Sequence, residues 1–159
     1  MDTMKRIPVP TDFSAHAYEA FRVAHTLARA VGAEVILFHI ARPPAVVSEG
    51  GKLLANPGKP DVVNLWDRFH TMPPADAGVR VERQVIVTDR PQAGHILEML
   101  DKLGCDLIVM GTHGRSWLKH HLFGSVAEEV VRLARCPVMV VKAPGPPTEP
   151  PMPEQMTEA

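Results

Sequence analysis

Short apolar runs alternate with helix-like segments along most of this chain. Residues 34–40, 107–110 and 138–141 are apolar at most positions, as expected of strands that are buried on both faces. Over residues 17–31, by contrast, the apolar residues recur at the spacing of one helix face. Strands that alternate with helices form a parallel sheet with helices on both faces. The pattern therefore predicts an α/β fold, a three-layer α/β/α sandwich.

Glycines, prolines and a serine indicate where these elements begin and end. Ser14 is a favourable N-cap, and Gly32 and Gly104 are typical of residues that follow the last turn of a helix. Pro8 and Pro10 cannot donate to a ladder, so the first strand should be brief or irregular. The sequence predicts strands at 7–10, 34–40, 79–87, 107–110 and 138–141, helices at 15–31, 61–71, 91–103 and from 125, and a loop over 41–60.

One folded domain is expected over residues 1–142, because a chain of this length can bury its own core. Residues 143–159 differ in composition: they hold six of the 16 prolines, three glutamates and no basic residue. Such a segment buries too little apolar surface to offset the entropy of ordering it. It is predicted to be a Pro-rich disordered tail.

Charge and cysteine content narrow the class of protein. The formal net charge of −1 gives no global field that would attract nucleic acid or an acidic membrane. No segment reaches the roughly 18 consecutive apolar residues of a membrane span, and residues 1–6 lack the apolar core of a secretory signal. Cys105 and Cys136 are too few for a disulfide framework and are expected to be reduced, small and mostly buried. A cytoplasmic protein is therefore expected.

A glycine-bearing segment follows the predicted strand at 107–110. It holds Gly111, Gly114 and Gly124, and Ser125 begins the next predicted helix. Glycine permits positive φ angles and the close approach of a ligand, while the free N–H groups at a helix start favour phosphate. The segment lacks the Gly-Lys-Ser/Thr ending of a Walker A loop and is longer than the dinucleotide fingerprint. It is either an anion site or a simple connection.

Asp12 follows the first predicted strand and has two interpretations. It could form the turn before the first helix, as aspartate often does. It could also accept hydrogen bonds from ribose hydroxyls, as acidic residues do in dinucleotide-binding folds. A receiver-type phosphoacceptor is less favoured, because no second acid adjoins Asp12 to help hold Mg²⁺. In a parallel sheet, Asp12 and the glycine-bearing segment should face each other where the strand order reverses.

The eight histidines and the serines show no metal-binding or catalytic pattern. His113, His120 and His121 share one segment, but no cysteine or acidic partner stands at a ligand spacing. No serine lies in a nucleophile-elbow motif. The sequence therefore predicts no metal site and no catalytic residue, although His113 could contact a phosphate.

Three ordered motifs resemble the universal stress protein (UspA-like) superfamily, over residues 4–142. Residues 9–14, Val-Pro-Thr-Asp-Phe-Ser, are similar to its first strand and turn. Gly111, Gly114 and the Gly124-Ser125 pair match the complete G-x2-G-x9-G-S/T pattern of its ATP-binding branch. Residues 136–141, Cys-Pro-Val-Met-Val-Val, are similar to its last strand. Pro8 and the Pro-rich tail depart from the family pattern.

This resemblance implies a five-stranded parallel sheet in the order 3-2-1-4-5, the adenine nucleotide alpha hydrolase-like arrangement. It also implies ATP, with Mg²⁺, bound between the loops that follow the first and fourth strands. Carried over by position, adenine and ribose would lie against Pro10, Thr11, Asp12, Ile40 and Gly111, and the phosphates against His113, Gly114, Arg115, Gly124, Ser125 and Val126.

The resemblance further implies a homodimer through the last strand, Val138 to Val141, which would cover an exposed sheet edge. The implied function is a stress-response switch in which ATP changes loop order and the recognition of an unknown protein partner. Two other functions stay open. One is slow ATP hydrolysis or phosphate transfer, for which Arg115, Lys119 and His113 supply charge but no general base is evident. The other is a nucleotide-independent interaction module acting through the dimer, Trp117 and the tail.

Overall fold

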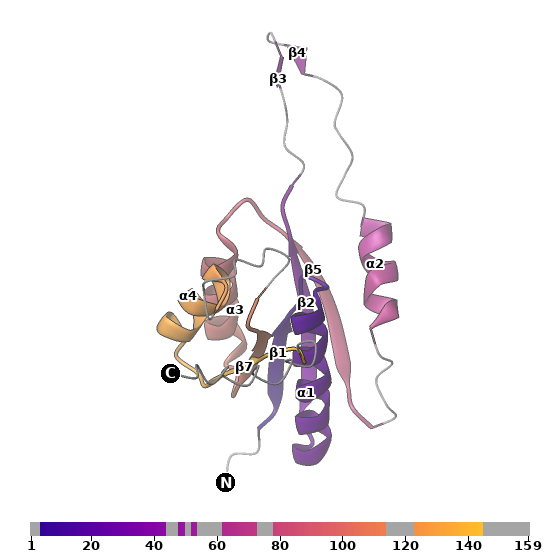
Figure 1. The fold of residues 1–159 in the computed structure, drawn as a ribbon, viewed down its shortest axis with the longest axis vertical. Helices are drawn as coiled ribbons and strands as arrows, with labels where there is room; N and C mark the ends of the chain where they lie inside the picture. The colour runs from indigo at the N-terminus through magenta and orange to yellow at the C-terminus, as the bar shows by residue number, and fades with distance from the viewer. Residues whose placement is uncertain are drawn as a thin grey trace, which may run out of the picture.

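The computed structural model describes residues 4–43, 62–72, 78–113 and 123–144. It also describes two short strands that lie between residues 43 and 62. The helices and strands alternate along the chain (Figure 1). The strands are β1 (Arg6–Pro10), β2 (Glu34–Ala41), β3 (Ser48–Glu49), β4 (Lys52–Leu53), β5 (Val81–Val87), β6 (Ile108–Gly111) and β7 (Val138–Val141). The helices are α1 (Ala15–Val31), α2 (Val62–Thr71), α3 (Gln92–Leu103) and α4 (Ser125–Leu133).

The longer strands lie in the order β5-β2-β1-β6-β7. β2 pairs in parallel with both β1 and β5, and β6 pairs in parallel with β7. β1 lies beside β6 and completes the order. Without the short β3 and β4, this is the 3-2-1-4-5 order. The predicted three-layer α/β/α fold is confirmed (Figure 1).

No backbone ladder joins β1 to β6 in the part of the chain that the structure describes. Successive residues of a parallel strand direct their N–H and C=O groups to opposite neighbours. Thr11 N–H donates to Phe38 O (2.8 Å), so the odd-numbered residues of β1 face β2. Pro8 and Pro10 are therefore on the β6 side, where they have no N–H to donate. The expected disturbance of the first strand falls on this one edge, which we call the proline seam.

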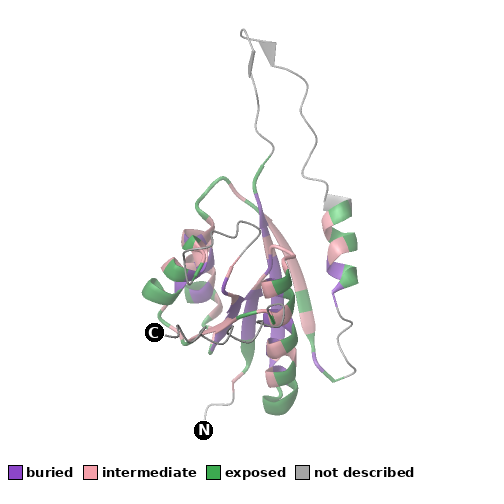
Figure 2. Ribbon diagram, in the orientation of Figure 1, coloured by how far each residue is buried: buried purple, intermediate pink, exposed green. Residues whose placement is uncertain are grey.

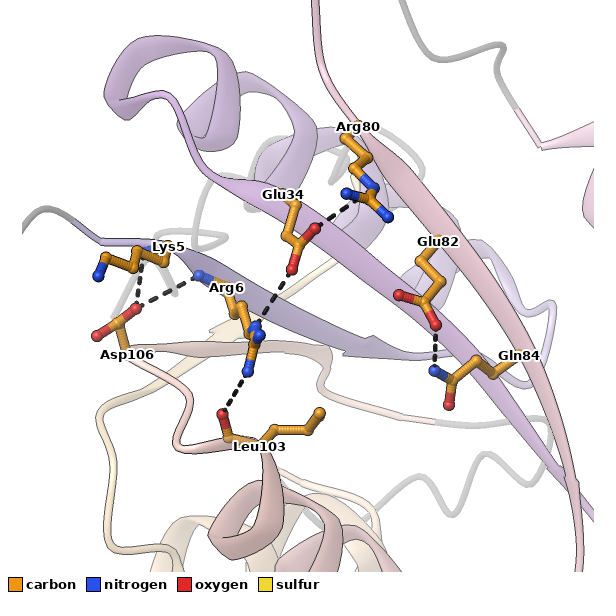
Figure 3. A network of polar contacts seen from close by, with 8 residues as sticks. All are labelled: Lys5, Arg6, Glu34, Arg80, Glu82, Gln84, Leu103 and Asp106. Carbon is orange, nitrogen blue, oxygen red and sulfur yellow. Dashed lines mark hydrogen bonds and ion pairs between the residues drawn. The ribbon is translucent and has the colours of Figure 1, made fainter.

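Side chains connect the two sides of the proline seam at the amino ends of the strands (Figure 3). Asp106 Oδ2 accepts hydrogen bonds from Lys5 N–H (2.7 Å) and Arg6 N–H (3.3 Å), and these two N–H groups lower the pKa of Asp106. The Arg6 guanidinium donates to Glu34 Oε1 (3.2 Å) and to Leu103 O (3.1 Å). The contacts with Asp106 and Leu103 join β1 to the chain that leads into β6, where the ladder is missing, while the contact with Glu34 joins β1 to β2.

Two apolar clusters lie on opposite faces of the sheet (Figure 1 and Figure 2). One contains Phe21 of α1, Phe69 of α2 and Leu37 of β2. The other contains Val130 of α4 and Phe38 of β2, together with residues of α3. Leu37 and Phe38 are neighbours in one strand, so their side chains point to opposite faces. Burial on both faces explains why β2 reads as an almost continuous apolar run.

The predicted helix ends are confirmed, but the segment predicted as a loop also contains two short strands. Ser14 Oγ accepts from Ala17 N–H (3.3 Å), and Gly32 and Gly104 have left-handed φ angles of 71° and 56°. Within the loop predicted over residues 41–60, β3 and β4 form a short antiparallel pair. Residues 145–159, most of the predicted tail, lie outside the described residues, so the domain boundary stays a prediction.

Candidate functional site

A cavity of about 630 Å³ opens at the carboxyl ends of β1, β2 and β6. Its walls come from the turn after β1, the end of β2, the start of α3 and the residues between β6 and α4. Ligands of parallel α/β sheets bind at this edge, where the strand order reverses. The cavity also falls in the size range of small-molecule sites, about 300–1,000 Å³. It is therefore the candidate functional site.

Every predicted site residue that the structure describes lines this cavity. Gly114 and Arg115 lie outside the described residues, so their predicted contacts with phosphate stay predictions. The predicted residues that line the cavity are Pro10, Thr11, Asp12, Ile40, Gly111, His113, Gly124, Ser125 and Val126.

The turn between β1 and α1 is held by its own side chains. Phe13 has a left-handed φ of 63°, which is uncommon for a bulky residue. Thr11 Oγ1 accepts from Phe13 N–H (3.0 Å), and Asp12 Oδ1 accepts from Ser14 N–H (2.9 Å). Asp12 therefore has the turn-forming role that was one of its two interpretations. The same bond fixes its carboxylate in the cavity wall.

His39 joins this turn to β2 and also lines the cavity. Thr11 O accepts a 2.7 Å hydrogen bond from His39 Nδ1, which must therefore carry the proton. The ring of Phe13 lies 4.9 Å from the ring of His39 and 5.1 Å from that of Phe69. The left-handed turn is thus anchored in the apolar cluster under α2.

Gly111 contributes to packing as well as to the cavity wall. A Cβ atom added to Gly111 would lie 2.8 Å from His16 C and 3.0 Å from Ala17 N, in the first turn of α1. Real Cβ atoms essentially never approach backbone this closely. Residue 111 must therefore be glycine for β6 to end against α1, whatever the cavity holds.

The first residues of α4 and its N-cap form part of the cavity wall. Gly124 is the N-cap of α4 and offers no side-chain oxygen, unlike Ser14 at the start of α1. Gly124 N–H donates to Thr112 O (2.7 Å), which brings the end of β6 and the start of α4 together. Ser125 and Val126, the first residues of the helix, line the cavity. An uncapped helix start is suited to an anion, because its N–H groups and dipole are both positive.

His16 connects α1 to the chain beyond β7. Its Nδ1 accepts from Ala143 N–H (2.9 Å) and lies 3.1 Å from Thr112 Oγ1, so this nitrogen carries no proton. The ring of His113 lies 5.5 Å from that of His16. Burial lowers the pKa of His16, and His113 and Lys142 lower it further, while Asp12 opposes them.

The protein is expected to lose stability as the pH falls below 6.5, the ordinary pKa of histidine. The folded-state pKa values of His16 and His25 are lowered, mainly by burial, so the unfolded chain takes up protons first. This contribution is complete above pH 6.5 and is lost as the pH falls from 6.5 towards the lowered values. Urea unfolding at about pH 7.5 and about pH 5.5 measures it. In His16→Gln the pH dependence should be weaker; an unchanged dependence would show that His16 is not its source.

The sequence prediction missed several residues of the cavity wall. Arg42 directly follows β2, and Pro91 and Gln92 stand at the start of α3. Glu129, one turn into α4, places a carboxylate in the wall. These residues belong to no motif; only the rule that parallel strands end at one edge could have indicated the residues after β2 and β5.

Neither a metal centre nor a membrane span is found among the described residues. No group of three or more histidine, cysteine, aspartate or glutamate side chains in those ranges could hold a metal ion. Over the same ranges, no helix has the length and apolar character to cross a membrane.

Comparison with curated proteins finds universal stress proteins over most of the chain. Universal stress protein MJ0531 of Methanocaldococcus jannaschii is 34% identical over 144 residues, covering 88% of this chain and 83% of that protein. Universal stress protein MJ0577 of the same organism is 30% identical over 156 residues, covering 87% and 94%.

Solved structures of universal stress proteins share the fold. UspA from Lactobacillus plantarum superposes with a TM-score of 0.69 at 20% identity, covering 89% of this chain and 99% of that one. A universal stress protein in complex with cAMP has a TM-score of 0.64 at 24% identity, covering 90% and 100%. The universal stress protein from Archaeoglobus fulgidus in complex with dAMP has a TM-score of 0.62 at 22% identity, covering 89% and 100%.

A match to the family's sequence profile covers residues 3–142, which include all the longer strands and all four described helices. The fold, the relatives and this match agree, and the chain belongs to the Universal stress protein family.

Proposed function

We propose that this chain binds an adenine nucleotide, ATP with Mg²⁺, in the cavity at the carboxyl ends of β1, β2 and β6. The observation that carries the proposal is that one cavity combines a carboxylate with the positive start of a helix. A carboxylate held in a tight turn, Asp12, and the uncapped start of α4 at Ser125 both line the cavity. The first suits ribose hydroxyls and the second suits phosphate. Relatives of the same fold hold cAMP and dAMP, which supports the choice of an adenine nucleotide.

The proposed contacts divide between the two halves of the sheet. Adenine and ribose lie against Pro10, Thr11, Asp12 and Ile40, with Gly111 at the ribose. The phosphates lie against His113, Gly124, Ser125 and Val126 and against Gly114 and Arg115. Mg²⁺ would be held chiefly by the phosphates and would offset their repulsion from the Glu129 carboxylate in the cavity wall. Bound Mg²⁺ neutralises phosphate charge.

Titration calorimetry with ATP·Mg tests the proposal. The natural protein should bind, and Gly124→Val combined with Ser125→Ala should weaken binding by about a hundredfold or more, since the valine side chain obstructs the N–H groups of α4. Asp12→Ala should weaken it by about tenfold, through the lost ribose contact. Thr26→Ala, on the exposed face of α1, is the control and should leave the affinity unchanged. Absence of binding by the natural protein at millimolar nucleotide would refute the proposal.

The proposed biological role is a stress-response switch in the cytoplasm. Nucleotide would bind one arrangement of the loops better than another and so shift the population recognised by a protein partner. The position of the cavity supports this role, because its wall includes His113 and Gly124, which stand on either side of residues 114–123. We expect ATP·Mg to slow cleavage of the chain between these two residues in limited proteolysis. An identical cleavage pattern with and without nucleotide would contradict the switch.

We propose further that the protein forms a homodimer through β7. β7 is the last strand of its sheet, and each of its four residues, Val138 to Val141, is partly exposed. An apolar strand edge of this kind is usually covered in a stable protein. Val140→Asp should convert a dimer into a monomer in analytical ultracentrifugation. A natural protein that sediments as a monomer at micromolar concentration would rule out this interface.

A further inference from the structure

A second, smaller cavity of about 170 Å³ exposes two cysteines away from the candidate nucleotide site. It lies beside the residues that precede β6 and β7, at the amino ends of these strands. The residues around it come from the end of α3, the turn after it and the chain before β7: Leu100, Asp101, Gly104, Cys105, Arg135 and Cys136. None of these residues lines the larger cavity.

The strand register brings the two cysteines together. β6 and β7 pair from Ile108↔Val138 onward, so the residues just before each strand are also neighbours. Cys105 Sγ lies 3.2 Å from Cys136 Sγ, and both thiols are free. Both residues are partly exposed. A disulfide bond of about 2 Å requires the sulfurs to approach by only about 1 Å.

We propose that Cys105 and Cys136 form a reversible intrachain disulfide when the protein meets a low-molecular-weight disulfide such as oxidised glutathione. Both cysteines line the small cavity and are partly exposed, so the disulfide group of such a reagent can reach a sulfur. This inference concerns the amino ends of the strands and is independent of nucleotide binding.

The exchange proceeds in two balanced steps. The thiolate of one cysteine attacks a sulfur of the reagent, forms a mixed disulfide and releases one reagent thiol. The second cysteine then attacks the protein sulfur of that mixed disulfide and releases the other. The two cysteine sulfurs are oxidised, the reagent disulfide is reduced to two thiols, and these thiols take up the two cysteine protons. Burial raises the pKa of Cys105, and the neighbouring Cys136 raises it further.

The disulfide would close a covalent ring from residue 105 to residue 136. This ring contains β6, α4 and the chain between them, and hence Gly111, His113, Gly124 and Ser125 of the candidate site. A ring of this size restricts the unfolded chain more than the folded one. Oxidation should therefore stabilise the protein.

Equilibration of the full chain with oxidised glutathione tests the inference. Intact-mass spectrometry should show the loss of two hydrogens, and peptide mapping should show Cys105 joined to Cys136. The oxidised protein should melt about 5 °C or more above the reduced protein. With the second thiol missing, Cys105→Ser and Cys136→Ser should each stop at a single mixed disulfide with glutathione and form no intrachain bond.

Three results would overturn the inference. These are two free thiols after equilibration with excess oxidised glutathione, crosslinked dimers in place of an intrachain bond, and an unchanged melting temperature after oxidation. The mass measurement uses the natural chain, so it decides the matter even where a serine variant fails to fold.

Discussion

Gly111→Ala is expected to lower the free energy of unfolding by about 3 kcal/mol, the upper range for overpacking a well-packed site. The added methyl would lie 2.8 Å from a backbone carbon of His16, and a backbone atom in the first turn of a helix cannot move aside as a side chain can. Relief requires α1 and β6 to separate, which disturbs the end of β6 at the cavity. Urea unfolding measures the stability. Titration of the variant under conditions where it is folded should show a lower affinity for ATP·Mg.

Gly94→Ala is the matched control for this substitution. Gly94 lies in α3, and a Cβ atom added there meets nothing within 4 Å. Alanine favours a helix over glycine by about 1 kcal/mol, so this variant should be as stable as the natural protein or more so. A Gly111→Ala protein that unfolds at the natural urea concentration would show that β6 does not abut α1 as described.

Phe69→Ala is expected to lower the free energy of unfolding by about 4 kcal/mol. Phe69 is fully buried and attaches α2 to the cluster that holds Phe21 and Leu37. Its ring also lies 5.1 Å from that of Phe13, whose left-handed backbone shapes the turn at Asp12. Removing the ring should therefore loosen this turn as well, and nucleotide affinity should fall even at temperatures where the variant is folded.

Leu133→Ala provides the comparison, because Leu133 is 51% exposed at the end of α4. Its loss should cost less than about 1 kcal/mol, since little apolar surface leaves water there on folding. Equal losses in the two variants would mean that α2 is not packed on the sheet through Phe69. Circular dichroism during urea unfolding, with both variants in one buffer, distinguishes these outcomes.

Most of the fold was predictable from the sequence because its signals are local. Apolar runs such as 34–40 and the caps Ser14 and Gly32 each specify nearby backbone. The β3–β4 pair was missed because each strand has only two residues, although Gly50-Gly51 between them is a pair that favours tight hairpins.

Contacts between distant segments were harder to predict. The family resemblance implied a ribose contact for Gly111, whereas its closest structural constraint is the first turn of α1, far away in the chain. The approach of Cys105 to Cys136 depends on the register of β6 against β7, which no local pattern specifies. Arg42 and Gln92 reach the cavity only because their strands end at the same edge. In each case the contact depends on how distant segments pack together, which local sequence patterns do not specify.

The proline seam has a mechanical consequence. A β-sheet transmits load through its ladders, but between β1 and β6 load must pass through side-chain packing and Asp106. The candidate cavity takes Thr11 and Ile40 from one side of the seam and Gly111 and Ser125 from the other. A molecule bound there would contact both the β5-β2-β1 part and the β6-β7 part of the sheet and so connect them. Filling the cavity should thus stiffen the carboxyl edge just where the polypeptide has left it without backbone bonds.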